Sequence, residues 1–117
     1  MVPLIRNITL SFSLLFGTIA ACDALRPIVL VHGLKADFYD MKPIERHIRK
    51  HLSRDVYIKN VKLGFGKYTS FSNMYHQVEW LRHELANDPR LKNGCNIIAH
   101  SQGGLVTRYF IERYNYP

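Results

Sequence analysis

A serine set between small residues is the strongest chemical signal in this chain of 117 residues. A largely apolar run at 96–99 leads through His100 to Ser101, and Gly103 and Gly104 follow closely. A tight turn between a buried strand and a helix presents a serine hydroxyl to a substrate beside free backbone N–H groups, an arrangement called a nucleophile elbow. The pattern therefore predicts that Ser101 is the nucleophile of an acyl-transfer reaction.

The small residues around Ser101 fit the geometry of such an elbow. The turn needs small side chains two positions before and two positions after the nucleophile, because the strand and the helix nearly touch there. Gly103 meets this need, and Ala99 stands one methyl group away from the usual glycine. His100 and Gly104 are expected to support the same turn. The alternative, that Ser101 only caps the following helix, is less consistent with the two glycines.

Two backbone N–H groups are candidates for an oxyanion hole. The N–H of Gln102 lies at the start of a predicted helix, where free donors and the helix dipole favour negative charge. The second candidate is the N–H of Leu34, in the loop where Gly33 would let the backbone approach a substrate carbonyl. We expect His32 to hold this loop. Neither His32 nor His100 is expected to be the catalytic base, because the base of this arrangement comes from a later strand.

Predicted strands and helices alternate along the chain. The strands are expected at 27–33, 56–61 and 96–100, and the helices from Pro43 to near His51, from about Ser72 to about Asn87, and from Gln102 to about Tyr114. Such alternation predicts a parallel sheet with its chemistry at the carboxyl ends of the strands. The fold class is therefore α/β, and a three-layer α/β-hydrolase fold is the specific expectation.

Apolar spacing indicates which helix faces should be buried. In the first helix, Ile44, Ile48 and Leu52 recur at every fourth position and should face the sheet. The third helix carries Leu105 and Val106 near its start among its apolar residues.

The length of the chain limits what it can hold. A complete α/β hydrolase needs roughly 200 residues or more, because its sheet is covered on both faces and parallel strands require long connections. Residues 25–117 are therefore expected to be the N-terminal part of a truncated domain, with about three strands and three helices. The acid and the base that would activate Ser101 are expected outside the chain, which would leave it inactive alone.

Residues 1–24 have the layout of a secretory signal peptide. An uncharged run from Ile8 to Ala20 follows Arg6 and ends in small residues, with cleavage expected near positions 20–24. The run is shorter than the ~20 residues that span a bilayer. The expected destination is the secretory pathway, ending in the lysosome or outside the cell. In a bacterial host, Cys22 would also fit a lipoprotein signal.

Charge and cysteine content exclude several classes of function. The net charge of +7 is spread along the chain, without the basic stripe and interleaved aromatics of a nucleic-acid-binding module. It is compatible with weak association with anionic membrane surfaces. Two cysteines are too few for a disulfide framework. Cys95 is expected either to be a small buried hydrophobic residue or to pair with a residue outside these 117. No metal-ligand spacing is present, so no metal is expected.

Three segments together resemble the palmitoyl-protein thioesterases, over residues 26–117. They are 26–34, 85–94 with its Leu-Ala-Asn-Asp-Pro-Arg-Leu run, and 97–104 with Ser-Gln-Gly-Gly. The resemblance implies a lysosomal or secreted α/β hydrolase that removes long-chain acyl groups such as palmitate from the S-acylated cysteines of proteins or peptides, without a cofactor. It implies that Ser101 is the nucleophile and that Leu34 and Gln102 supply the oxyanion donors. The catalytic Asp and His of the family lie farther downstream.

Two other functions remain open from the sequence. A secreted triacylglycerol lipase or carboxylesterase would share the His-Gly loop and the serine elbow. A non-catalytic truncated product, acting by binding if at all, would retain the same motifs without turnover. Substrate preference of the full-length protein separates the first alternative, and the downstream reading frame separates the second.

Overall fold

Three parallel strands form the centre of the fold in the computed structural model, which describes residues 25–64 and 71–114. The expected signal peptide at 1–24 lies outside the described residues. β1 (Ile28–Val31) lies between β2 (Ile58–Asn60) and β3 (Asn96–Ala99), and residue Ile28 pairs with Ile58 on one side and Asn96 on the other. All four residues of β1 are buried.

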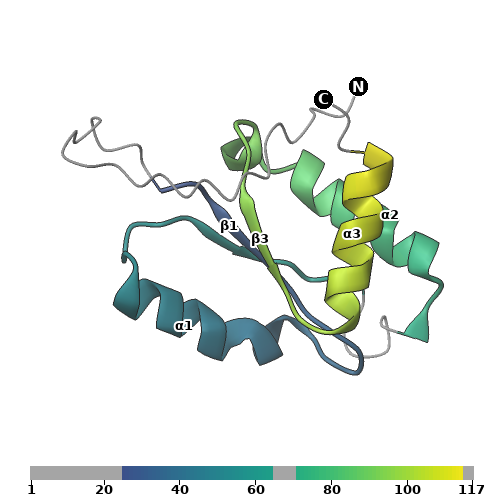
Figure 1. The fold of residues 1–117 in the computed structure, drawn as a ribbon, viewed down its shortest axis with the longest axis horizontal. Helices are drawn as coiled ribbons and strands as arrows, with labels where there is room; N and C mark the ends of the chain where they lie inside the picture. Colours follow the sequence, from purple (N-terminus) through teal and green to yellow (C-terminus); the bar gives the residue numbers. More distant parts are fainter. Residues whose placement is uncertain (1–24, 65–70, 115–117) are drawn as a thin grey trace.

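Helices cover both faces of this sheet (Figure 1). α1 (Lys42–His51) lies on one face, and α2 (Met74–Ala86) and α3 (Gln102–Tyr114) lie side by side on the other. Two short 3-10 helices, η1 (Phe38–Met41) and η3 (Pro89–Leu91), complete the described elements. The parallel order and the three layers agree with the sequence-based expectation, and they form the N-terminal part of an α/β-hydrolase fold.

The side chains of β1 alternate between two hydrophobic clusters, because successive residues of a strand point to opposite faces. Val29 and Val31 belong to the larger cluster, under α2 and α3. Ile28 and Leu30 belong to the smaller cluster, against which Ile44 of α1 packs. A strand buried on both faces explains the unbroken apolar run that predicted it.

Two apolar residues of the helices are exposed. Ile44 and Ile48 pack on the sheet as predicted, but Leu52 caps the end of α1 and is 55% exposed. Leu105 in α3 is 61% exposed, whereas Val106 beside it is fully buried. The helical period alone could not separate these positions, because burial also depends on how far the sheet extends beneath each helix.

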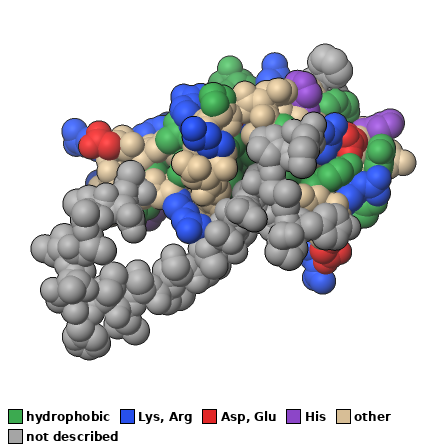
Figure 2. All heavy atoms as spheres, turned by 90° about the horizontal axis from the view of Figure 1, so that it is seen from above, with side chains coloured by type: hydrophobic (Ala, Val, Ile, Leu, Met, Phe, Trp, Pro, Cys, Tyr) green, Lys and Arg blue, Asp and Glu red, His purple; other side chains and the backbone are tan. Residues whose placement is uncertain are grey.

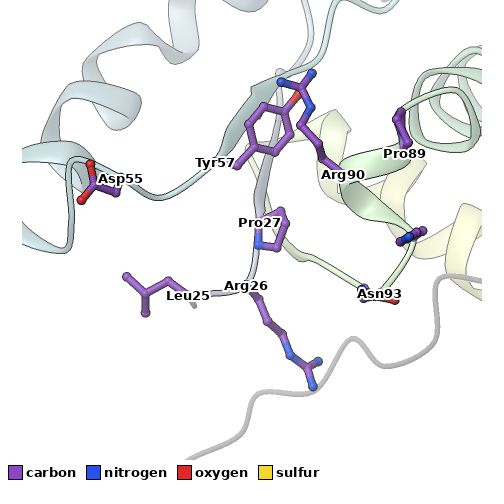
Figure 3. Close-up of a pocket in the computed structure, with 10 residues that line it drawn as sticks. Leu25, Arg26, Pro27, Asp55, Tyr57, Pro89, Arg90 and Asn93 are labelled. Carbon is purple, nitrogen blue, oxygen red and sulfur yellow. The ribbon is translucent and has the colours of Figure 1, made fainter. Parts of the chain in front are cut away.

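The run at 85–91 that carried much of the resemblance has a structural role here. Asp88 accepts hydrogen bonds from the Tyr57 hydroxyl (2.5 Å) and from Nε of Arg90 (3.0 Å), and Lys59 Nζ lies 3.7 Å from it. Arg90 also lies over the Tyr57 ring, 3.9 Å from its centroid. These contacts connect η3 to β2. Figure 3 shows Tyr57 and Arg90 beside Pro27 in a hollow of about 730 Å³, near the start of β1.

Hydrogen bonding determines the charge state of this buried carboxylate. Burial raises the pKa of Asp88, but the hydrogen bonds from Arg90 and Tyr57 outweigh it and lower the pKa to about 2. For Tyr57, burial and the neighbouring carboxylate raise the pKa to about 12. Asp88 is therefore ionised and Tyr57 neutral over the whole physiological range.

We predict that Asp88→Asn lowers the free energy of unfolding by about 2 kcal/mol near neutral pH, because the carboxylate and its ion pairs are lost. The unfolded pKa of Asp is near 3.9, so this contribution is present above about pH 4 and is lost as the pH falls through about 2. Urea unfolding followed by Trp80 fluorescence over a pH series measures it. Exposed Asp55→Asn is the control, with little effect expected. A pH-independent difference for Asp88→Asn would contradict the assignment.

Candidate active site

Ser101 occupies a strained turn between β3 and α3. It follows His100 at the end of β3, and Gln102 begins α3 directly after it. The φ angle of Ser101 is 55°, in the left-handed region that residues other than glycine rarely adopt. The side chain is exposed. An exposed serine at positive φ between a strand and a helix is the geometry of a nucleophile elbow.

Gly103 allows α3 to approach the end of β1. A Cβ atom at this position would lie 2.4 Å from the carbonyl oxygen of His32 and 2.7 Å from that of Val31. Gly33 is also confined, since a Cβ atom there would lie 2.8 Å from the carbonyl oxygen of His100 and 2.9 Å from Cβ of Ser101. The two glycines therefore bring the loop after β1 against the elbow.

The two proposed oxyanion donors lie on these two adjoining segments. Among the described residues, no hydrogen bond involves the N–H of Leu34 or the N–H of Gln102. The loop that carries Leu34 is held from within: His32 is buried with Nδ1 3.3 Å from the carbonyl oxygen of Gly33, which also accepts a hydrogen bond from Ala36 N–H. That His32 positions the loop stays a prediction.

A cavity of about 310 Å³ opens beside the elbow. Its lining includes Leu34 and His100 together with Met41 and Ile44 from the opposite side. Apolar side chains predominate, so the cavity suits a hydrophobic substrate group better than a charged one. The lining by η1 and α1 was not evident from the sequence, because no local pattern relates residues 40–44 to residue 100.

Ala99, His100 and Gly104 are the remaining residues that were expected to support the turn. Ala99 packs against the larger hydrophobic cluster, and His100 is exposed. A Cβ atom at Gly104 would meet nothing within 4 Å, so the space around this glycine does not require its small size. The sequence also gave no sign that Lys35, beside Leu34, adopts a φ of 57°.

No base contacts Ser101 within residues 25–64 and 71–114. No hydrogen bond involves its hydroxyl there, and Nδ1 of the buried His32 lies against Gly33. The same residues contain no group of His, Cys, Asp or Glu that could hold a metal ion. The described part of the chain thus contains an exposed serine and two N–H groups without a hydrogen bond, but no base in contact with the serine.

The fold and the elbow define the chain as the N-terminal part of an α/β hydrolase. A family model described as palmitoyl protein thioesterase matches residues 27–117. The chain therefore belongs to the palmitoyl-protein thioesterase family, a family of hydrolases.

Two curated relatives bear on this assignment. The chain is 40% identical over 100 residues to Palmitoyl-protein thioesterase 3 of Dictyostelium discoideum. The aligned residues cover 85% of this chain and 34% of the relative. It is 31% identical over 87 residues to a Probable alcohol acetyltransferase of Saccharomyces cerevisiae. Here the aligned residues cover 73% of this chain and 25% of that protein. The chain thus spans about a third or less of the length of these relatives.

We predict opposite effects for the two adjacent glycines of the elbow. Gly103→Ala should lower the free energy of unfolding by on the order of 3 kcal/mol, because its methyl group meets backbone carbonyls that cannot rotate away. The control Gly104→Ala should raise it by about 0.5 to 1 kcal/mol through helix propensity alone. Urea unfolding of both variants tests this, and equal effects would show that α3 does not approach β1 this closely.

The positive φ of Ser101 also has a measurable cost. Ser101→Gly should be more stable than Ser101→Ala by about 1 kcal/mol, because glycine adopts the left-handed conformation without a Cβ clash. Neither variant retains the hydroxyl, so the comparison isolates the backbone. If the alanine variant were as stable as the glycine variant in thermal unfolding, the turn would not be strained.

Proposed function

We propose that the protein to which this chain belongs hydrolyses long-chain acyl thioesters, such as palmitoyl groups on cysteine, with Ser101 as the nucleophile. The observation that carries the proposal is the strained turn at Ser101. This turn packs against the loop of Leu34, whose backbone N–H makes no hydrogen bond within the described residues. Membership of the thioesterase family supports the thioester as substrate. The apolar cavity beside the elbow is compatible with an acyl chain.

The proposed reaction passes through an acyl-enzyme. Oγ of Ser101 attacks the thioester carbonyl while a base takes its proton, and the carbonyl oxygen becomes an oxyanion that accepts hydrogen bonds from the N–H groups of Leu34 and Gln102. The carbon–sulfur bond then breaks, and the cysteine leaves as a thiol with that proton. Water attacks the serine ester in the same way and releases the fatty acid. Each oxyanion donor contributes about 3 kcal/mol to such a step.

The base is proposed to be a histidine outside the described residues, oriented by a carboxylate, as the α/β-hydrolase arrangement requires. Without it the serine hydroxyl is a weak nucleophile, so we infer that residues 1–117 alone have no meaningful turnover. The domain assignment is part of the same proposal: residues 1–24 act as a signal peptide, and the remainder is the first part of the catalytic domain.

We propose that the protein enters the secretory pathway and acts in the lysosome or outside the cell, on S-acylated proteins or peptides. None of the helices in 25–64 and 71–114 has the length and hydrophobicity that crossing a membrane requires. The net charge of +7 favours weak attraction to anionic membrane surfaces, where lipid-anchored substrates are found.

We expect the protein made from the full-length transcript to hydrolyse a palmitoyl thioester peptide, and Ser101→Ala to lower kcat by at least about a thousandfold. The chain of 117 residues, assayed in parallel, should show no turnover. Triacylglycerol and short alcohol esters are the comparison substrates, because the second relative is named as an acetyltransferase that acts on alcohols. Activity on esters alone would contradict the thioesterase proposal in favour of a lipase or carboxylesterase.

A further inference from the structure

The end of α1 gathers positive charge around an open hollow. Four basic side chains line this hollow, which has a volume of about 420 Å³: Arg46, Arg49, Lys50 and Arg54. On the face shown in Figure 2 the Lys and Arg side chains are spread among other types. All four residues that line this hollow are basic, whereas the hollow near Pro27 is lined by acidic, aromatic and apolar residues as well as basic ones.

Arg49 forms the fixed side of this hollow. Its guanidinium donates hydrogen bonds to the carbonyl oxygens of Arg54 (3.3 Å) and Val56 (3.0 Å) and to the carboxylate of Glu45 (3.3 Å). These bonds hold the segment after α1 against the helix. The shape of the hollow thus depends on internal contacts, and no ligand is needed to form it.

The other three cations lack acidic partners. Within residues 25–64 and 71–114, no ion pair involves Arg46, Lys50 or Arg54. Arg46 and Lys50 are four positions apart on the helix, where like charges repel and destabilise it. An anion in the hollow would relieve this repulsion and would contact all three side chains.

An exposed apolar residue follows α1, close in the chain to two of the basic residues. Leu52, 55% exposed, directly follows α1 and is two positions from both Lys50 and Arg54 in the sequence. Basic side chains without acidic partners, together with an exposed aliphatic one at the same end of a helix, are a combination that suits the interface of an anionic membrane. A free phosphate would use the cations but would gain nothing from Leu52.

We propose that the end of α1 docks on anionic lipid headgroups at a membrane surface. One site, the end of α1, would then account for the attraction to anionic surfaces proposed above. This docking does not depend on the hydrolytic activity. The start of the same helix contributes Ile44 to the cavity beside the elbow. The ten residues of α1 span about 15 Å, so docking would hold the elbow close to acyl chains anchored in that membrane.

The test is co-sedimentation of the full-length protein, made without the proposed signal peptide at 1–24, with vesicles of phosphatidylcholine and phosphatidylserine, with phosphatidylcholine alone as the reference. Arg46→Gln/Lys50→Gln should weaken binding to the anionic vesicles by at least about tenfold. Glutamine keeps the helix propensity of both positions, and circular dichroism checks the fold. The charge-matched control is Lys62→Gln/Lys92→Gln, both exposed and outside the hollow, which should change binding by less than about threefold.

A second variant, Leu52→Gln, should weaken vesicle binding by about threefold or more if the site meets a membrane interface. Equal weakening by the two double variants would overturn the assignment to α1 and leave only a general attraction by net charge. Absence of binding by the unmodified chain would overturn both. If Leu52→Gln bound vesicles as the unmodified protein does, and inorganic phosphate competed with the vesicles, the hollow would be a site for a soluble anion rather than for a membrane surface. None of these outcomes depends on thioesterase activity.

Discussion

The candidate site depends on the close packing of the first turn of α3 against the carboxyl end of β1. This packing leaves room only for a hydrogen atom at Gly103, whose place is bounded by the carbonyl oxygens of Val31 and His32. It determines the direction in which the chain leaves β3 and thus requires the positive φ of Ser101. The same contact brings the loop of Leu34 beside the serine. The proposed nucleophile and its two proposed N–H donors are therefore arranged by backbone packing before any substrate arrives.

The strained backbone at Ser101 requires a rigid surrounding structure. A residue in the left-handed region costs on the order of 1 to 3 kcal/mol and persists only when its surroundings leave no alternative. Here the surroundings are β1, buried on both faces, and the two hydrophobic clusters that hold helices on either side of it. The internal hydrogen bonds of the loop at 33–36 add a second constraint. The core of the fold thus maintains the exposed geometry of the site.

Local sequence patterns predicted the strands, the helices and the tight turn at Ser101 because each has a short-range cause. Apolar runs indicated β1 and β3, and the glycine two positions after Ser101 indicated the tight turn. The apolar spacing of the first helix overestimated its buried face at Leu52, where burial depends on the extent of the sheet. Local patterns also missed the contribution of Ile44 to the cavity and the role of Asp88 as a link to β2, because both are contacts between segments far apart in the chain.

Cys95 shows how burial limits the chemistry of a side chain in the core. It lies directly before β3 and is fully buried, and this burial raises the pKa of its thiol to about 11. Only a thiolate reacts readily with an activated acyl group. Cys95 precedes β3 and Ser101 follows it, so six residue steps of extended chain, up to about 20 Å, separate the thiol from the serine. Held as a neutral thiol inside the core, Cys95 is protected from oxidation and from thiol reagents while the fold is intact, so its modification would report that the core has opened.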